Sequence, residues 1–444
     1  TPPPPTDLNG DGLPDLVLAG YQPILDVPDY ATTTRIHLGT ADGFEATPSQ
    51  ELEGFGTRQV LVEDLDQDGH LDLILVNNRV SDEEFEVPSF VYWGLDGGFD
   101  AARRSELPCK AGNAAAVADL NRDGRLDLVL ACYKGGRSYV YWGGADRLDP
   151  DDSLVLDMVG ARAVVARDLN GDGWIDLAFA SERDENDANR CQSTVMLNGP
   201  EGFSRDRSVP LDTIGAVKVL AGDPNQDGFT DLLYVNQHDG EDYAVDSYLY
   251  WGSAAGWSVE DRFAMATQGA SDAAIADLNG DGLEDIAFAN WFDGERYDVD
   301  STIFWNAEHG FAPEQRTGLP TLGTRRVVVA DLNLDGFPDL ALPSFCTDGH
   351  FPPEGRVFWG TVDGPVTEGM TALEPGGVRG VTVSDGNLDG WPDLFFGGYN
   401  SPCHISAEES YAFWGGERGF GTPQVIDSPV IYADPVIVGG GAVR

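Results

Sequence analysis

The chain has 444 residues, among them 75 Asp or Glu against 27 Lys or Arg, so its formal net charge at pH 7 is −48. Nucleic acid and anionic membrane surfaces are therefore excluded as expected partners, because both are themselves negatively charged. Hydrophobic residues make up 41% of the chain, which is ample for a large buried core. The composition indicates a soluble protein that is secreted (extracellular) or held at the cell surface.

Residues 1–6 read Thr-Pro-Pro-Pro-Pro-Thr and differ in composition from everything that follows. Proline-rich segments of this kind form stiff, extended spacers, and residues 1–6 lack the apolar run of a signal peptide. No run of eighteen apolar residues occurs in the chain, so no transmembrane segment is expected. We expect residues 7–444 to form a single domain.

One nine-residue acidic motif recurs eight times from residue 7 onward. Every copy has Asp at its first, fifth and ninth positions, Asn or Asp at its third and Gly at its sixth. The copies begin at Asp7, Asp64, Asp119, Asp168, Asp223, Asp277, Asp331 and Asp385, with spacings of 57, 55, 49, 55, 54, 54 and 54 residues. A solvated turn is the plainer interpretation, but it predicts drift at the polar positions, and the eight copies show none.

The spacing of these oxygen side chains is typical of a calcium-binding loop. Ca²⁺ takes six to eight oxygen ligands at about 2.3–2.6 Å, so a short loop must curl around the ion and turn alternate side chains inward. The glycine allows the sharp turn because it has no Cβ. We predict about eight bound Ca²⁺ ions, whose side-chain ligands are Asp7, Asn9, Asp11, Asp15, Asp64, Asp66, Asp68, Asp72, Asp119, Asn121, Asp123, Asp127, Asp168, Asn170, Asp172, Asp176, Asp223, Asn225, Asp227, Asp231, Asp277, Asn279, Asp281, Asp285, Asp331, Asn333, Asp335, Asp339, Asp385, Asn387, Asp389 and Asp393.

The seventh copy shows which strands surround one motif. Residues 323–330 form a β-branched run, hence a strand, and the calcium loop follows. Residues 339–343 and 356–360 are expected as the second and third strands, joined by a polar loop at 344–355. A fourth, irregular segment lies within 366–376. No amphipathic helical stretch accompanies these strands.

Four antiparallel strands in each of eight repeats predict an all-β fold, an eight-bladed β-propeller. An open solenoid is the alternative, but it needs polar capping repeats, and no repeat is atypical in this way. The first loop has only residues 1–6 before it and so lacks a first strand. Residues 435–439 fall in the register of a first strand that no loop follows. We expect this C-terminal strand to join the first blade and close the ring.

The third strand of most repeats carries a tryptophan. These residues are Trp93, Trp142, Trp251, Trp305, Trp359 and Trp414, with Leu38 and Leu197 at the same place in the other two repeats. A recurring aromatic residue can be a binding platform, but packing between blades is its more common role. We therefore expect these side chains to pack between blades.

Five cysteines are present, so at least one is unpaired or pairs outside the chain. No Cys-x-x-Cys motif occurs, so no zinc site is expected. Cys346 and Cys403 fall in second-to-third-strand loops of consecutive repeats, and we expect them to form a disulfide. A second disulfide, Cys109–Cys132, is also expected.

The motif Asp-x-Asn-x-Asp-Gly-x-x-Asp-Leu, at this period and between two strands, resembles the FG-GAP/VCBS repeat. Proteins with this repeat include the propeller of integrin α subunits and many secreted bacterial proteins. EF-hands and dockerins share the early loop positions, but they place a helix after the loop, where this chain has a Leu-rich strand. The resemblance covers essentially the whole chain and implies a calcium-stabilised propeller that binds a partner.

Calcium loops that join first to second strands all lie on one face of a propeller, and the second-to-third-strand loops lie on the other. These second-to-third loops are the longest and most variable parts of the repeat, and variable loops on a rigid scaffold are frequent binding sites. Their flat rings, amides and carboxylates suit carbohydrate, although solvated loops are the plainer alternative. The residues predicted to bind a ligand there are His238, Tyr243, Trp291, Tyr297, Tyr399 and His404, and Trp291 is expected to be exposed.

Four arginines stand six residues before the first Asp of a loop, namely Arg58, Arg162, Arg325 and Arg379. At the start of inner strands they are expected to meet at the mouth of the central channel. Ion pairs with the abundant carboxylates are one interpretation. A site for an anion, such as a uronate or sulfate group, is the other.

Three classes of function remain open, and the first is favoured. It is a lectin-like or adhesive protein, expected to be a monomer, that binds carbohydrate through the face opposite the calcium loops. The second is a structural scaffold that binds another extracellular protein. The third is a polysaccharide lyase, which needs a His or Tyr base. His238, His350 and His404 lie in loops of that face, but no catalytic motif marks them.

Overall fold

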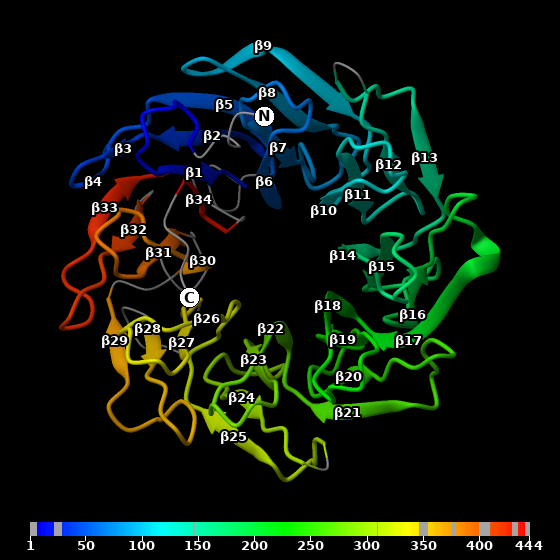
Figure 1. Ribbon diagram of the computed structural model, residues 1–444, viewed down its shortest axis with the longest axis vertical. Helices are drawn as coiled ribbons and strands as arrows, with labels where there is room; N and C mark the ends of the chain where they lie inside the picture. The colour runs from blue at the N-terminus through cyan, green and yellow to red at the C-terminus, as the bar shows by residue number, and fades with distance from the viewer. Residues whose placement is uncertain are drawn as a thin grey trace.

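Eight four-stranded antiparallel sheets surround a central axis in the computed structural model (Figure 1). The structure describes residues 7–21, 29–144, 147–308, 310–345, 354–374, 378–398, 409–428 and 434–439. Within these residues, helix is limited to the 3₁₀ turn η1 (Arg205–Arg207). The predicted all-β, eight-bladed β-propeller is confirmed.

Blades 1 to 4 occupy the first half of the chain. Blade 1 consists of β34 (Val436–Val438), β1 (Asp15–Ala19), β2 (Ala31–His37) and β5 (Gln50–Phe55), and a small hairpin of β3 (Gly39–Thr40) and β4 (Gly43–Phe44) accompanies it. Blade 2 consists of β6 (Gln59–Glu63), β7 (Asp72–Val76), β8 (Ser89–Leu95) and β9 (Gly98–Leu107). Blade 3 has β10 (Gly112–Ala118), β11 (Asp127–Cys132), β12 (Ser138–Tyr141) and β13 (Ser153–Leu156), and blade 4 has β14 (Ala161–Arg167), β15 (Asp176–Ser181), β16 (Arg190–Met196) and β17 (Ser208–Ile214).

Blades 5 to 8 repeat the same strand order. Blade 5 consists of β18 (Ala216–Gly222), β19 (Asp231–Asn236), β20 (Asp246–Tyr250) and β21 (Arg262–Ala266), and blade 6 of β22 (Ala270–Ala276), β23 (Asp285–Asn290), β24 (Ser301–Phe304) and β25 (Arg316–Leu319). Blade 7 consists of β26 (Val328–Ala330), β27 (Asp339–Leu342), β28 (Gly355–Phe358) and β29 (Thr371–Leu373). Blade 8 consists of β30 (Val378–Ser384), β31 (Asp393–Gly398), β32 (Glu409–Phe413) and β33 (Gln424–Asp427).

The ring closes within blade 1. Its innermost strand, β34, comes from the C-terminal part of the chain and pairs antiparallel with β1, with Asp15 opposite Val438 and Val17 opposite Val436. Figure 1 shows the red β34 beside the blue β1. This is the closure predicted from residues 435–439.

The second strand of every blade is buried along its whole length, as in β1, β7 and β11. Such strands read as almost continuous apolar runs because both of their faces are covered by neighbouring blades. Each begins at the ninth-position Asp of its acidic loop, so the loop and the core of the blade are directly joined.

Most inner strands contain a β-bulge near their start. In β10, β14, β18, β22 and β30 the register shifts across one residue. In blade 7 the expected strand over 323–330 is interrupted at the same place. Only an isolated bridge, Thr324–Ser344, pairs there before β26 begins at Val328. A bulge turns the extra side chain in a new direction, which determines what lies at the channel mouth.

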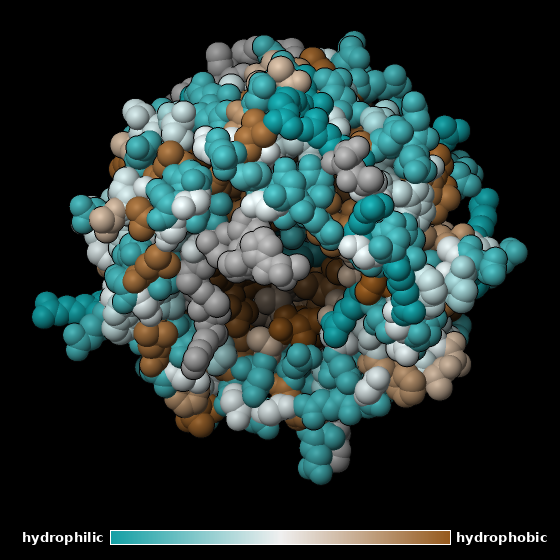
Figure 2. Space-filling model, turned by 45° about the horizontal axis from the view of Figure 1, so that its top comes forward, coloured by the Kyte–Doolittle hydropathy of each residue, from teal (hydrophilic) through white to brown (hydrophobic). Residues whose placement is uncertain are grey.

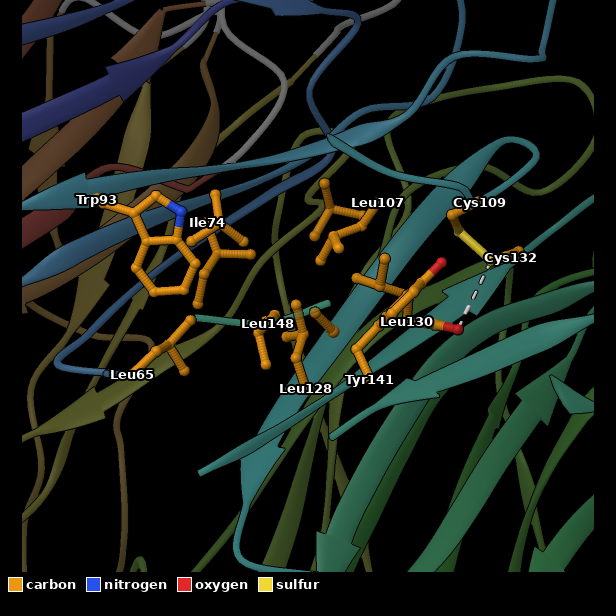
Figure 3. Close-up of a cluster of buried hydrophobic side chains, with 13 residues drawn as sticks. Leu65, Ile74, Trp93, Leu107, Cys109, Leu128, Leu130, Cys132, Tyr141 and Leu148 are labelled. Atoms are coloured by element: carbon orange, nitrogen blue, oxygen red, sulfur yellow. Dashed lines mark hydrogen bonds between the residues drawn. A yellow bond between two sulfur atoms is a disulfide. The ribbon is translucent and has the colours of Figure 1, made fainter. Parts of the chain in front are cut away.

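The third-strand tryptophans pack between blades, as predicted. Trp251 of blade 5 stacks on Phe311 of blade 6, with ring centroids 6.3 Å apart, and Trp359 stacks on Phe420 at 6.4 Å. Trp93 of blade 2 is 1% exposed and belongs to a buried cluster that includes Leu128 of blade 3 (Figure 3). These side chains fill the space between neighbouring blades.

Cys109 and Cys132 form a disulfide, as predicted, with Cα atoms 5.5 Å apart. Figure 3 shows the bond at one edge of the buried cluster between blades 2 and 3. Cys191 is buried and carries a free thiol. The predicted Cys346–Cys403 bond falls outside the described residues.

A hollow with apolar residues on its walls opens at the centre of the ring in Figure 2. Among the described residues, no helix is long and apolar enough to cross a membrane.

Candidate metal loops and the opposite face

Backbone N–H groups hold the carboxylates of each acidic loop. In the seventh loop both oxygens of Asp331 accept hydrogen bonds, from the N–H groups of Asp335 and Gly336 at 2.9 Å each. Asn333 Oδ1 accepts from Asp335 N at 2.9 Å, and Asp335 Oδ1 accepts from Phe337 N at 2.9 Å. The first, second, third, fifth, sixth and eighth loops repeat the contact from the fifth-position N–H to the first Asp. The loop therefore curls around its own oxygen side chains.

Two positions in every acidic loop have left-handed backbone geometry. The sixth-position glycine has a φ of 94° in the seventh loop (Gly336), which confirms the role predicted for it. The fourth position is also left-handed in all eight loops, as at Leu334 with φ 57° and Arg122 with φ 60°. Sequence reasoning missed this second position. The signal for it is weak, because Gly stands there in only three loops, as at Gly10.

The ninth-position Asp is the most buried member of the set. Asp339 is 0% exposed, and its two oxygens accept from Leu332 N at 2.8 Å and Gly360 N at 2.6 Å. Burial, together with the smaller effect of neighbouring loop carboxylates, raises the pKa of Asp339 to about 6, although the two backbone hydrogen bonds oppose the shift. Burial likewise raises the pKa of Asp72 and of Asp393 to about 7. Each loop thus holds a desolvated carboxyl beside other negative charges, an arrangement that a cation would stabilise.

The fifth loop differs in one contact. In the other seven loops the second-position N–H donates to the ninth Asp, but Pro224 has no N–H to donate. Oδ2 of Asp231 is accordingly buried without a hydrogen bond of normal geometry to any described residue. The N–H of Asn225 only slightly offsets the effect of burial, which raises the pKa of Asp231 to about 7.

These residues fit a hard divalent cation. In the second loop, oxygens of Asp64, Asp66 and Asp72 lie within 4.8 Å of one another, and the other loops have an Asn amide oxygen at the third position. Leaving Asp7 aside, no loop carboxylate forms an ion pair with a described Lys, Arg or His. All donors are oxygens, as Ca²⁺ prefers, and the buried Asp231 oxygen provides the same chemistry in the fifth loop.

The opposite face carries an aromatic cluster on blades 5 to 7. Tyr243 lies near Trp291 and Phe292, with ring centroids at 6.2 and 5.0 Å, and Tyr297 lies near Trp291 at 5.6 Å. His238 lies 5.3 Å from Tyr243. Four predicted ligand residues are thus side by side, together with Phe292, which the sequence reasoning did not single out.

Trp291 is half-buried, so the expectation of an exposed tryptophan was wrong. The guanidinium of Arg325 lies 3.4 Å from the centroid of its ring, and Phe345 packs edge-on at 6.1 Å. Both covering residues come from blade 7, and no pattern within residues 290–297 could have indicated them. The indole Nε1 is buried and has no hydrogen-bond partner within the described part of the chain.

The four predicted arginines line one cavity of about 90 Å³ at the channel mouth. Arg162 and Arg379 are the extra residues of the bulges in β14 and β30, so the bulge aims them at the channel. A fifth arginine, Arg326, also lines the cavity, and among the residues that the structure describes no Asp or Glu lines it. Sequence reasoning missed Arg326 because only its neighbour Arg325 fits the six-residue spacing.

The arginines have different partners. Arg162 forms an ion pair with Glu182 at 3.0 Å, and Arg326 contacts Asp434 at 2.9 Å. Arg58 lies over the ring of Tyr21, 4.7 Å from its centroid. Ion pairing therefore accounts for part of the cluster, while Arg58 and Arg325 lie against aromatic rings.

His238 approaches the ion pair of Arg162 and Glu182. Its Nε2 lies 3.7 Å from Glu182 Oε1, and burial lowers the pKa of the imidazole in spite of this carboxylate. The positive charge of Arg162 lowers the pKa of Glu182 against the effect of its burial. The predicted ligand residues Tyr399 and His404, and the third loop histidine, His350, lie outside the described residues.

Together these features define an eight-bladed propeller with an acidic loop in every blade and an arginine-lined channel mouth on the other face. The model of the FG-GAP-like repeat matches residues 7–75, 64–130, 119–179 and 277–342, more than half of the chain. The chain belongs to the FG-GAP-like repeat family.

Solved structures resemble the chain only distantly. A putative 6-phosphogluconolactonase from Bacteroides uniformis has a TM-score of 0.48 at 11% identity and covers 96% of this chain and 100% of its own. A Lactobacillus plantarum protein has a TM-score of 0.44 at 10% identity, with coverage of 82% and 98%. An Agrocybe aegerita lectin that recognises non-reducing terminal N-acetylglucosamine has a TM-score of 0.43 at 14% identity, with coverage of 97% and 96%. No curated protein matches the sequence.

Proposed function

We propose that this protein is an extracellular, calcium-stabilised propeller that binds carbohydrate through the face opposite its acidic loops. The observation that carries the proposal is the juxtaposition of the arginine-lined cavity with the aromatic cluster. Arg325 belongs to both, because it lines the cavity and covers the ring of Trp291.

Calcium is supported by the chemistry of the loops. Eight sets of oxygen donors recur with one spacing, and each has a ninth carboxyl that is at most 1% exposed. Affinities typical of extracellular calcium modules suffice where calcium is millimolar. The disulfide supports the same compartment, because disulfides persist mainly in oxidising environments.

Carbohydrate is supported by the composition of the opposite face. Flat rings offer surfaces for the C–H face of a sugar, and guanidinium groups bind carboxylate or sulfate in a bidentate manner. The cavity of about 90 Å³ admits one small substituent rather than a whole sugar ring. The fitting ligand is a glycan that presents an anionic group to the arginines while its ring lies against the aromatic cluster.

A glycan array in millimolar calcium tests this proposal. We expect binding to acidic glycans, with loss of signal in the Arg325→Gln and Trp291→Ala variants. Trp174→Ala is the matched control, because Trp174 occupies the seventh position of the fourth acidic loop, on the other face. An array without hits, or equal losses in Trp174→Ala, would contradict the proposed site and leave a protein-binding scaffold as the better function.

A lyase is the second candidate, and the position of His238 favours it. A half-buried imidazole with a lowered pKa is neutral near pH 7 and able to accept a proton, and Arg162 lies close enough for its positive charge to act on this imidazole. Incubation with uronate polysaccharides would give new ultraviolet absorbance from unsaturated products. If a polysaccharide that the protein binds on the array gives no such absorbance, lyase activity is excluded.

A further inference from the structure

A second cavity on the same face lies between blades 2 and 3. It has a volume of about 590 Å³, within the range of small-molecule sites. Its walls come from the residues before β8, the end of β9 and the β11–β12 loop. Three of its lining residues are basic, namely Lys110, Lys134 and Arg137. We call it the blade 2–3 pocket.

The acidic residues of the pocket already have cationic partners. Glu86 pairs with Lys110 at 2.6 Å, and Glu106 pairs with Arg104 at 2.8 Å. Within the part of the chain that the structure describes, Lys134 and Arg137 form no ion pair. The chain as a whole has a net charge of −48, so two cations without an ion-pair partner in one pocket stand out from its acidic surface.

Lys134 lies among other positive charges. Its Nζ is 3.8 Å from the centroid of the Phe85 ring. Burial lowers the pKa of Lys134, and Arg183, Arg79 and Lys110 lower it further, with Asp187 opposing them. An anion bound there would relieve this repulsion.

The two lysines are held on a rigid frame. Lys110 directly follows Cys109, and Lys134 stands two residues after Cys132, so the disulfide ties their segments together. The N–H of Lys134 also donates to the carbonyl of Lys110 at 3.1 Å. The frame sits on the buried cluster shown in Figure 3, so ligand binding requires little ordering of the backbone.

The remaining walls are apolar and flat. Val87, Pro88 and Pro108 line the pocket. Tyr139 lines it as well and is held by stacking on Tyr141, with ring centroids 5.8 Å apart. Such walls suit the C–H face of a sugar ring, and the cations suit an acidic substituent on that ring.

We propose that the blade 2–3 pocket is a second carbohydrate subsite that binds an acidic sugar, with Lys134 and Arg137 on its anionic group and Tyr139 against its ring. This subsite goes beyond the arginine-lined channel mouth and shares no lining residue with it. The anionic group is a carboxylate or a sulfate, and both are included in the test.

Lysine acetylation can locate the ligand, because the chain has only three lysines, Lys110, Lys134 and Lys218. The wild-type protein is treated with acetic anhydride at fixed calcium, with trigalacturonic acid, a sulfated trisaccharide or neutral maltotriose. At a ligand concentration of about ten times Kd, we expect acetylation of Lys134 to slow about tenfold with an acidic probe and to be unchanged with maltotriose. Peptide mass spectrometry measures the rate at each lysine.

Lys218 distinguishes this proposal from the proposed function. It stands on β18, next to Val217 of the arginine-lined cavity, where it contacts Asp272. Protection of Lys218 without Lys134 would place the acidic sugar at the channel mouth and overturn the second subsite. Protection of Lys134 alone would support the subsite and count against the channel mouth.

The double variant Lys134→Gln/Arg137→Gln tests the energetics. We expect its affinity for the bound acidic probe to fall at least about tenfold, as for loss of charged hydrogen bonds. Arg103→Gln/Arg418→Gln removes the same charge from two exposed positions and should leave the affinity unchanged. An equal loss of affinity in both double variants would show that the attraction is non-specific. Unchanged affinity in both would show that the blade 2–3 pocket does not bind the probe. If trigalacturonic acid binds, the anionic group is a carboxylate, and if the sulfated trisaccharide binds, it is a sulfate.

Discussion

At the scale of single residues, the acidic loops separate side chains that bind from side chains that shape the backbone. Asp335 turns its carboxylate into the seventh loop, whereas its neighbour Leu334 is 48% exposed and contributes a left-handed backbone. The two residues are adjacent but have different tasks, so they form a matched pair for mutation.

Asp335→Ala should remove one calcium ion of the expected eight and keep the fold. In calcium at a hundredfold excess over Kd, one lost site lowers the free energy of unfolding by about 2.7 kcal/mol. Elemental analysis and thermal denaturation measure the two effects. Leu334→Gly is the control, and it should retain all eight ions, since glycine adopts positive φ without strain. Loss of calcium in the glycine variant would show that the leucine side chain itself supports the site.

Cys191 should resist alkylation in the folded protein. Burial raises the pKa of its thiol to about 11 from an ordinary value of 9.0. The thiolate fraction at pH 8 is therefore about a hundredfold lower than in the unfolded chain. Because the folded pKa is the higher one, the stability linked to this thiol is present below pH 9 and is lost as the pH rises towards 11. Iodoacetamide labelling of the Cys191 peptide across pH, with and without urea, measures both values, and fast labelling of native protein at pH 8 would contradict them.

At the scale of elements, the disulfide joins the end of blade 2 to the second strand of blade 3. It closes a loop with a sequence separation of 23 residues. The Cys109→Ser/Cys132→Ser variant should lose about 3 kcal/mol of stability through the restored freedom of the unfolded chain. Urea denaturation measures this loss. The ring should survive, because Tyr133 N still donates to Ala111 O at 2.9 Å across the same junction, and a variant that fails to fold would show that the bond is needed for assembly.

The blades and their closure could be predicted from the sequence because the information is local. Every loop carries its own Asp set, every second strand is an apolar run, and residues 435–439 keep the register of a first strand. The burial of Trp291 was not predictable, since Arg325 and Phe345 reach it from the next blade. The bulges that aim Arg162 and Arg379 depend equally on pairing with another strand. Features that need contacts between blades remain invisible in a single repeat.

The blade 2–3 pocket illustrates the same limit. In the sequence, Lys110 and Lys134 are separated by β10, an acidic loop and β11, and the pairing of β10 with β11 brings them together. The rarity of lysine was visible from the composition, since the chain has only three. Its significance required the positions of two of them in one cavity.

At the scale of the whole molecule, calcium is expected to hold the ring together. Without a cation, close carboxylates repel by about 4 kcal/mol per pair at an effective dielectric constant of 20, before relaxation reduces the value. Several calcium sites together rival the stability of an ordinary domain, about 5–15 kcal/mol.

EDTA should therefore lower the thermal midpoint steeply at neutral pH, and glycan binding on the opposite face should disappear in parallel. Calorimetry and a binding assay, each repeated after calcium is restored, measure the two losses. If EDTA leaves the thermal midpoint unchanged, the acidic loops are ordinary turns and not metal sites. Loss of binding with the fold intact would mean that calcium contacts the glycan and that the binding face was assigned wrongly.

The pairing of β34 with β1 also determines how the ring responds to tension. The first residue of β1, Asp15, lies opposite the last residue of β34, Val438, so both chain ends leave the pair at the same end. A pull on the two ends therefore loads one rung at a time and peels the strands apart, instead of shearing all rungs together. Single-molecule pulling from both ends should open blade 1 first and at low force, whereas a pull between two loops of blade 5 should meet a higher force. An adhesive protein anchored through both ends would yield at this seam, while its binding face on the other blades stayed intact.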